Sequence, residues 1–206
     1  MIAHMARVSN PNATVDDPSD KLIKYLIDHK HWSPFEMACA CVEIETTRDI
    51  ARQILRHRSF HFQEFSQRYA EVEEEPILRQ ARMQDPKNRQ NSIQLKDALS
   101  LDDEDSVNFV WNRSQKLVYT TAQTLYKQAL DDGIAKEVAR ALLPEGLTPT
   151  KMYMQGTIRD WIHYIDIRTG PETQYEHRVV AGEIFQLLKT EIPTIIKAYW
   201  PEDFNP

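Results

Sequence analysis

The most regular pattern in the sequence is an alternation of apolar and other residues from Met37 to Glu45. Alanine, valine and isoleucine occupy the even positions from Ala38 to Ile44, whereas Cys39 and Cys41 fall on the odd side. Alternation with a period of two is typical of a half-buried β-strand. The two cysteines would then share one face, about 6.5–7 Å apart, near or beyond the limit for a disulfide. We therefore expect a strand over 37–45, with both thiols packed in the core.

Helical patterns lie on both sides of this strand. Asp17-Pro18-Ser19 is typical of a helix start, and Ser33-Pro34 is expected to end that helix. The stripe expected along it consists of Leu22, Tyr25, Leu26 and His29. A second helix should open at residue 46 or 47, both of them threonine. Gln53 and Arg56 are three residues apart and should share one face of that helix.

The second half of the chain has mostly helical patterns. A long helix is expected from Asp103 to Asp132, where Gly133 stops it. A short helix over 136–143, an extended segment over 147–155 and helices over 157–168, 173–190 and 193–200 should follow. Thr157 and Asp160 have the spacing of an N-cap at the start of the 157–168 helix. The apolar positions that define the long helix are Val107, Val110, Trp111, Leu117, Val118, Leu125 and Ala129.

These elements indicate the α+β class. We expect a mostly helical single domain over 1–206 with a small antiparallel or mixed sheet, because the strands are too few for a doubly wound fold. Residues 73–100 are acidic and polar and contain two prolines, so a surface excursion is expected there.

Composition narrows the class of protein. With 206 residues, of which 41% are hydrophobic and 27% charged, the chain is typical of soluble globular proteins. Its net charge of −6 argues against nucleic-acid binding. No stretch approaches the roughly 18 apolar residues of a membrane-spanning helix, and the first residues lack the apolar region of a signal peptide. A cytoplasmic protein that binds neither nucleic acid nor membrane is therefore expected.

The segment Arg56–Tyr69 concentrates side chains that bind anions. It holds three arginines, two histidines, two serines and a glutamate, with aromatic residues between them. A planar guanidinium can donate two parallel hydrogen bonds to a phosphate. The five glycines are scattered beyond residue 132, so the chain has no glycine-rich phosphate loop. A second basic group in the C-terminal half consists of Arg140, Arg159, His163 and Arg168.

Other interpretations of this segment compete on the residues alone. It could be a solvated helix end with ordinary ion pairs, although the interleaved aromatic residues argue against that. Its arginines and aromatic rings could stack on the bases of RNA or DNA. The negative net charge of the chain argues against this interpretation. His57 and His61 could bind a metal, but no third ligand lies nearby in the sequence, so no metal is expected.

The same residues resemble the signature of the flavin-dependent thymidylate synthases, Arg-His-Arg-x-x-Ser-x-Asn-Glu-x-Ser-x-Arg-Tyr. The sequence matches it at Arg56–Arg58 and from Glu64 to Tyr69, whereas His61 and Gln63 replace its first serine and its asparagine. The resemblance covers about residues 3–190. A strand that precedes Ala6–Ser9 in the family is expected either to be missing or to lie upstream of residue 1. Further similar segments are His31–Glu36, Val138–Pro144, Thr157–Arg159 and Ile167–Arg168.

The resemblance implies an activity. Members of this family methylate dUMP reductively to dTMP, with methylenetetrahydrofolate as carbon donor, FAD as hydride carrier and NADPH as reductant. They assemble as homotetramers with active sites shared between subunits. They use no cysteine nucleophile, which agrees with two cysteines that sit in a strand without a histidine or a helix N-terminus beside them.

The resemblance also implies roles for individual residues. Arg168 matches the arginine that meets the uracil ring and is the candidate catalytic residue. His163 stands where other members have asparagine. Ser66 is expected to bind substrate, since no histidine–carboxylate pair is evident to activate it as a nucleophile. The dUMP contacts implied are Gln53, Arg56, Glu64, Phe65, Ser66, Gln67, Arg68, Arg140 and Arg168. The FAD contacts implied are His31, Ser33, Arg56, His57, Arg58, Glu64, Thr157, Arg159 and His163.

Overall fold

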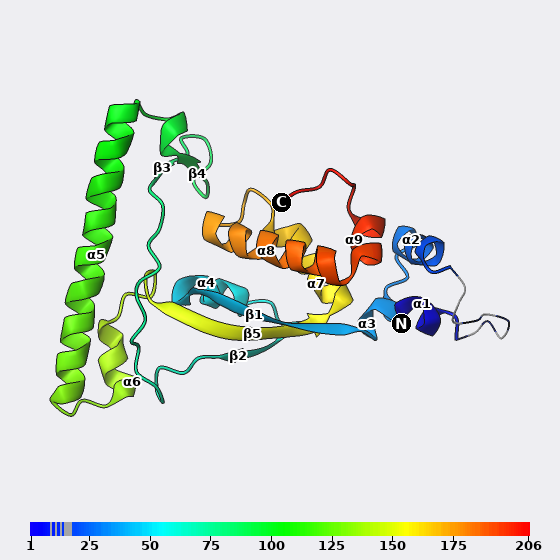
Figure 1. Ribbon diagram of the computed structural model, residues 1–206, viewed down its shortest axis with the longest axis horizontal. Helices are drawn as coiled ribbons and strands as arrows, with labels where there is room; N and C mark the ends of the chain where they lie inside the picture. The colour runs from blue at the N-terminus through cyan, green and yellow to red at the C-terminus, as the bar shows by residue number, and fades with distance from the viewer. Residues whose placement is uncertain (9, 11, 13, 15–17) are drawn as a thin grey trace. The chain divides into compact units, whose positions relative to one another are not determined.

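The computed structural model describes residues 1–8, 10, 12, 14 and 18–206 (Figure 1). Ser9 and the predicted helix start at Asp17 lie outside the described residues. The chain forms two compact units. Unit 1 consists of Met1–Val42, His57–Phe62 and Tyr153–Pro206, and unit 2 of Glu43–Arg56 and Gln63–Met152. The single domain expected over 1–206 stays a prediction.

Three strands form one sheet, in the order β1-β5-β2 (Figure 1). They are β1 (Cys39–Thr47), β5 (Pro149–Thr157) and β2 (His61–Glu64). The predicted strand and the predicted extended segment are both confirmed. Together with the many helices, this small sheet confirms the predicted α+β class.

Burial alternates along β1 as its sequence predicts. The even positions from Val42 to Thr46 are buried, whereas Glu43 and Glu45 are exposed. The predicted burial of the two cysteines is wrong, because Cys39 and Cys41 are exposed free thiols. They occupy the odd positions, which form the exposed face of the strand together with the two glutamates.

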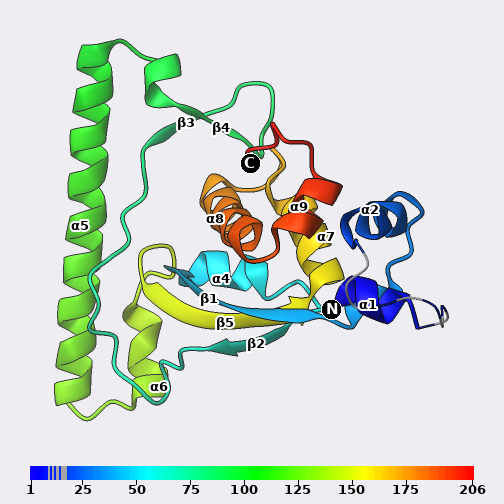
Figure 2. The same cartoon turned by 45° about the vertical axis from the view of Figure 1, so that its right-hand side comes forward.

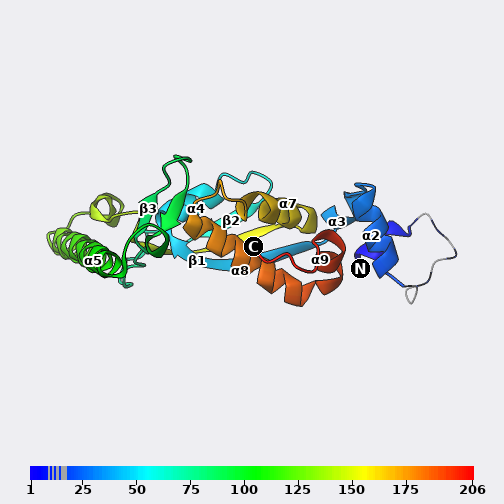
Figure 3. The ribbon, with the colours of Figure 1, turned by 90° about the horizontal axis from the view of Figure 1, so that it is seen from above.

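The helices of unit 1 pack on one another around aromatic side chains. Helix α7 packs on α8, α9 packs on α8 and on α2, and α3 packs on α7 (Figures 2 and 3). Phe35, Trp161, Tyr164 and Phe185 are almost completely buried in this core. The helices are α1 (Ile2–Ala6), α2 (Asp20–Asp28), α3 (Ser33–Glu36), α7 (Ile158–Arg168), α8 (Tyr175–Glu191) and α9 (Pro193–Tyr199).

Helix α7 begins with the capping box that its sequence predicts. The Thr157 hydroxyl accepts a hydrogen bond from the Asp160 backbone N–H at 3.2 Å. The Asp160 carboxylate in turn accepts from the Thr157 backbone N–H at 2.9 Å. This exchange satisfies two N–H groups at the helix start. The helix runs to Arg168, as predicted.

Two local predictions in the N-terminal segment are wrong. Ser33-Pro34 begins the short helix α3, because a proline in the first helical turn has no intrahelical N–H bond to lose. The buried side chains of α2 are Ile23, Leu26 and Ile27. Of the predicted stripe, Tyr25 and His29 are exposed, and their rings stack on each other 4.0 Å apart.

Unit 2 is built on the long helix α5. The helix α6 and the 3-10 turn η2 pack on α5, and Tyr126, Ala139 and Leu143 share a buried cluster with Val72. Gly133, with φ of 84°, follows the end of α5, where the sequence predicts that the long helix stops. The elements of unit 2 are α4 (Arg48–Ile54), β3 (Arg82–Gln84), β4 (Ser92–Gln94), η1 (Leu95–Asp97), α5 (Leu101–Asp131), α6 (Lys136–Ala139) and η2 (Arg140–Leu142).

The length of α5 is predicted well, but its apolar positions do not form the buried face. Its buried residues are Gln115, Tyr119 and Tyr126. Leu117 and Leu125 lie on the other side of the helix and are 64% and 53% exposed. Within unit 2, α5 uses polar side chains to hold the neighbouring segment, and much of its apolar surface is left uncovered.

The segment 73–100 is tied to α5 by hydrogen bonds. The Trp111 indole N–H donates to the Arg79 carbonyl at 2.8 Å, and the Tyr119 hydroxyl donates to the Glu74 carbonyl at 2.7 Å. Strands β3 and β4 pair antiparallel within it, with Met83 opposite Ile93. Ion pairing of Arg79 with Asp49, at 2.5 Å, fixes the same segment to α4.

A histidine lies in the aromatic core of unit 1. His177 is completely buried, and its Nε2 lies 3.0 Å from the Tyr164 hydroxyl. Burial, together with the nearby charges of Arg168 and His57, lowers the pKa of His177 to about 3. The ring is therefore neutral in the folded protein at neutral pH.

Acid should destabilise the fold through His177. Between a pKa of about 6.5 in the unfolded chain and about 3 in the folded protein, only the unfolded state binds this proton. The free energy of unfolding therefore falls as the pH drops below about 6.5, by up to about 1.4 kcal/mol per pH unit from this group. Urea denaturation at a series of pH values should show a shallower acid loss for His177→Gln, which keeps a partner for Tyr164 but does not titrate. Parallel curves for the two proteins would contradict the assignment.

Candidate active site

The signature segment begins where α4 ends. Helix α4 stops at Ile54, so Gln53 lies in its last turn and Arg56 lies beyond it. The prediction that these two residues share a helical face is therefore wrong. The Arg56 backbone N–H instead donates to the Gln53 carbonyl at 3.3 Å in a turn. This turn leaves the Arg56 side chain exposed.

Arg168 and His57 form the central contact of the site residues in unit 1. The Arg168 Nε–H donates to His57 Nε2 at 2.8 Å. The His57 ring packs against the rings of Tyr164 and Phe60, at 4.9 and 6.2 Å between centroids. Burial, together with the nearby charges of Arg168 and His163, lowers the pKa of His57 to about 4. A neutral ring can accept the hydrogen bond, which fixes the guanidinium at the end of α7.

The remaining hydrogen-bond capacity of Arg168 is at the outer end of its guanidinium. Among the described residues, His57 is its hydrogen-bond partner, and the two terminal nitrogens have none. These nitrogens form a planar fork that suits a ring or carboxylate oxygen. The contact therefore turns a flexible side chain into an oriented cation.

Among the other residues implied as FAD contacts, Ser33 lies on α3, and Arg159 and His163 lie on α7. Arg159 forms an ion pair with Glu36, so the His31–Glu36 segment is tied to α7. His31, Ser33, Arg58 and His163 are exposed. The Thr157 hydroxyl already serves the α7 cap, where it donates to Asp160 Oδ2 at 2.6 Å. The sequence did not predict the ion pair between Glu36 and Arg159.

In unit 2, Glu64 is held by a buried arginine that sequence reasoning also missed. Arg48 Nη1 lies 3.3 Å from Glu64 Oε1, and the Thr150 hydroxyl donates to the same oxygen at 3.0 Å. Arg48 is 6% exposed, and burial lowers its pKa. A signal was present, because Arg48 continues the even-numbered register whose earlier members, from Val42 to Thr46, are buried.

Two of the arginines expected to bind dUMP meet at Glu137. Arg68 Nε lies 3.5 Å from the Glu137 carboxylate, and Arg140 Nε donates to the Glu137 carbonyl at 3.2 Å. The Arg68 and Glu137 side chains are both more than half exposed, so this ion pair is weak and can yield to a stronger anion. Because Arg68 and Arg140 both contact Glu137, unit 2 has two cationic side chains that a phosphate could bridge.

The residues after Glu64 pair once with β5 and then form a turn from Ser66 to Tyr69. The Phe65 backbone N–H donates to the Lys151 carbonyl at 2.9 Å, and the Ser66 carbonyl accepts from Tyr69. Gln67 is 3% exposed, and its amide Nε2 is buried without a hydrogen-bond partner among the described residues. Such an unsatisfied donor is uncommon in folded proteins, and a bound water or ligand group is one way to satisfy it.

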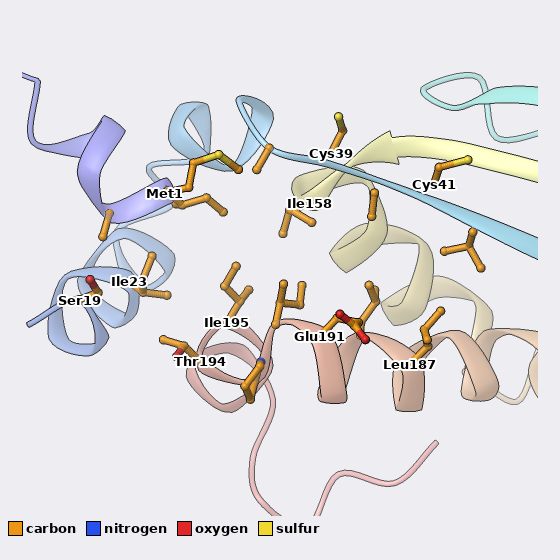
Figure 4. A pocket seen from close by; sticks show the side chains of 18 residues that line it. Met1, Ser19, Ile23, Cys39, Cys41, Ile158, Leu187, Glu191, Thr194 and Ile195 are labelled. Atoms are coloured by element: carbon orange, nitrogen blue, oxygen red, sulfur yellow. The ribbon is translucent and has the colours of Figure 1, made fainter. Parts of the chain in front are cut away.

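A cavity of about 700 Å³ lies elsewhere in unit 1 (Figure 4). Its lining is mostly aliphatic, and Ile158 and Ile195 point toward each other across it, whereas the Cys39 side chain points away. Cys41 also borders it. None of the candidate site residues lines this cavity, so it is separate from the arginine–histidine contacts.

Two features that the described residues lack are a membrane-spanning helix and a metal-binding cluster. Within the part of the chain that the structure describes, no helix is long and apolar enough to cross a membrane. In the same residues, no group of three or more histidine, cysteine, aspartate or glutamate side chains is arranged to hold a metal ion.

Comparison with known proteins identifies the family. The family model described as "Thymidylate synthase complementing protein" matches residues 1–194. A probable flavin-dependent thymidylate synthase of Paramecium bursaria Chlorella virus 1 is 51% identical over 199 residues, which cover 96% of this chain and 88% of the relative. The flavin-dependent thymidylate synthase of Synechocystis sp. is 46% identical over 200 residues, covering 96% and 87%.

A solved structure agrees with these sequence relatives. The UMP/dUMP methylase PolB from Streptomyces cacaoi, bound with 5-Br dUMP, superposes with a TM-score of 0.80 at 27% identity. The match covers 96% of this chain and 88% of that one. By sequence and by fold, the chain belongs to the family of flavin-dependent thymidylate synthases.

Proposed function

We propose that this protein converts dUMP to dTMP, with methylenetetrahydrofolate as carbon donor, FAD as hydride carrier and NADPH as the reductant of the flavin. The observation that carries the proposal is the Arg56–Tyr69 segment, whose signature residues occur in a chain of this family. The names of the relatives and the 5-Br dUMP bound to PolB support a pyrimidine nucleotide as substrate. We expect the reaction to take place in the cytoplasm.

The residues implied for FAD have the chemistry that this cofactor needs. FAD, when bound, would accept a hydride from NADPH and pass it on. Its pyrophosphate requires cations, and without a glycine-rich loop these must come from side chains such as the exposed Arg58 and the α7 residue Arg159. His31 and His163 are exposed and can donate or accept hydrogen bonds.

The residues implied for dUMP offer positive charge and donors. Arg68 and Arg140, which meet at Glu137, would bind the phosphate together with Arg56 and Ser66. The buried, orphaned amide of Gln67 supports a ligand near this turn. Phe65, which is 37% exposed, would contact the nucleotide through its ring, and Gln53 and Glu64 would supply polar contacts.

Arg168 would act on the pyrimidine ring. Because His57 orients the guanidinium, its terminal nitrogens can meet the uracil oxygen with little reorganisation. The cation would stabilise negative charge on the ring as N3 loses its proton and C5 becomes nucleophilic. No thiol takes part, and the exposed Cys39 and Cys41 border a cavity separate from these residues.

A homotetramer with shared active sites is part of the proposal. Val110, Leu117 and Leu125 recur at intervals of seven and eight residues along α5, and each is more than half exposed. Side chains at this spacing share one side of a helix. An apolar helix face of this kind on a protein surface is typical of a contact with another protein.

The purified protein should contain flavin. We expect the absorption bands of oxidised FAD, either as isolated or after FAD is added and the excess removed. The same preparation should form dTMP from dUMP when the folate and NADPH are supplied. A colourless protein that takes up no FAD would contradict the proposal and favour a binding protein that uses the same arginines.

Arg168→Ala should lower turnover by about 10²–10³-fold, because it removes a charge that stabilises the transition state. FAD should remain bound, since the contacts implied for it lie at other residues. Arg168→Lys should recover only part of the activity, because an ammonium lacks the planar fork. Turnover and flavin occupancy are measured together, and wild-type turnover by Arg168→Ala would mean that the arginine only caps α7.

Replacement of both cysteines by alanine should leave dTMP formation nearly unchanged. Because both thiols are exposed, we expect a change in the free energy of unfolding within about 0.5 kcal/mol. Turnover of the flavin-loaded double variant decides the point. A folded double variant without activity would require a cysteine-based mechanism.

Charges on the apolar face of α5 should disrupt the tetramer. Leu117→Glu combined with Leu125→Glu would place two carboxylates in the contact, and light scattering should report a smaller species. Lys127→Glu is the matched control, since it lies on the polar side of α5 and changes the net charge by the same amount. An unchanged mass for the double variant would place the subunit contact elsewhere.

A further inference from the structure

Arg48 occupies a costly position for a charged side chain. It is almost completely buried, and the side chain of its partner Glu64 is 17% exposed. Taking two charges out of water costs several kcal/mol per ion, so a buried ion pair is weak evidence for stability. Arg48 is also the first residue of α4, where the positive end of the helix dipole disfavours a cation. Stability therefore does not explain why an arginine stands here.

Thr150 adds a second donor to the same carboxylate oxygen. Its hydroxyl is buried in β5 and donates to Glu64 Oε1 at 3.0 Å, while Arg48 Nη1 lies 3.3 Å from that oxygen. Among the described residues, Glu64 Oε2 has no hydrogen-bond partner. Oε1 of the Glu64 carboxylate is thus bound by Arg48 and Thr150, and Oε2 is still able to accept a hydrogen bond.

An anionic acceptor held in this way has a defined chemical use. An ionised carboxylate only accepts hydrogen bonds, so Oε2 would select a ligand group that carries an N–H or O–H. Arg48 places a positive charge beside the Glu64 carboxylate, and the hydrogen bond from the Thr150 hydroxyl fixes its rotation. Glu64 directly precedes the turn with Phe65 and Ser66, both of which are implied to contact dUMP.

We propose that Arg48 and Thr150 are positioning residues for substrate, which hold the Glu64 carboxylate so that its Oε2 accepts a hydrogen bond from the pyrimidine nucleotide. The inference rests on the proposed function, since it takes dUMP as the ligand. The donor would be the N3–H of the ring or the hydroxyl of the sugar. Neither Arg48 nor Thr150 touches the ligand, so both act through Glu64 alone.

The test is a double-mutant cycle on dUMP binding to the FAD-loaded protein, measured by calorimetry. Glu64→Gln, Arg48→Met and Thr150→Val should each raise the dissociation constant of dUMP about tenfold or more, the value of a hydrogen bond to a charged group. Combining Arg48→Met or Thr150→Val with Glu64→Gln should add little further loss. Residues that act through a shared partner are non-additive in this way.

Conservative variants separate positioning from folding. Arg48→Lys keeps a charge and Thr150→Ser keeps the hydroxyl, so both should bind dUMP much closer to wild type than Arg48→Met and Thr150→Val. Arg52→Met is the matched control, because Arg52 lies on the same helix and pairs with Glu145 at 2.9 Å on the surface. It should leave the dissociation constant unchanged.

Two results would overturn the inference while leaving the proposed function intact. The first is a wild-type protein that binds and methylates dUMP, with losses that simply add in the double variants. The second is a Thr150→Val variant that folds, binds FAD and retains wild-type affinity for dUMP. A wild-type protein that fails to bind dUMP would remove the proposed function and this inference with it.

Discussion

The hydrogen bond from Arg168 to a neutral His57 is the interaction on which the role proposed for Arg168 depends. It exists because His57 is packed among the rings of Phe60 and Tyr164, where a second positive charge beside Arg168 would be unfavourable. Burial therefore determines the protonation state of the histidine, and the protonation state determines that it accepts. The aromatic core, the end of α7 and the orientation of the guanidinium are consequences of one packing arrangement.

In unit 2 a carboxylate is held in place, and its partner is a charged arginine rather than a neutral side chain. The Glu64 carboxylate is placed against a buried arginine and a threonine hydroxyl, in a position where water is mostly absent. In both arrangements, a polar contact inside the protein fixes a charged group. The other atoms of that group remain able to form hydrogen bonds with a ligand. Preorganised groups of this kind stabilise a developing charge without reorganising during the reaction. This is what a flavin enzyme must supply, because the cofactor carries the difficult chemistry.

The sequence predicts the local features well. The capping box of Thr157 and Asp160, the end of the long helix at Gly133 and the alternation along β1 each depend on neighbours in the chain, and all are confirmed. The signature segment led to the correct family, although its individual residue roles rest on the resemblance.

Features that depend on distant residues are predicted less well. The partners of Arg48 and Arg159 lie 16 and 123 residues away, and no local pattern indicates them. On α5, apolar spacing locates the helix but not the face that neighbours cover, and Leu117, one of the apolar positions that define the helix, is exposed.

In the proposed reaction the methyl carbon comes from the folate, and the flavin is required. Methylenetetrahydrofolate labelled with carbon-13 in its methylene group, supplied with dUMP and NADPH, tests this directly by nuclear magnetic resonance. The label should appear in the C5 methyl group of dTMP, and only when FAD is bound to the protein. Unlabelled product, or labelled dTMP formed by protein stripped of flavin, would contradict it.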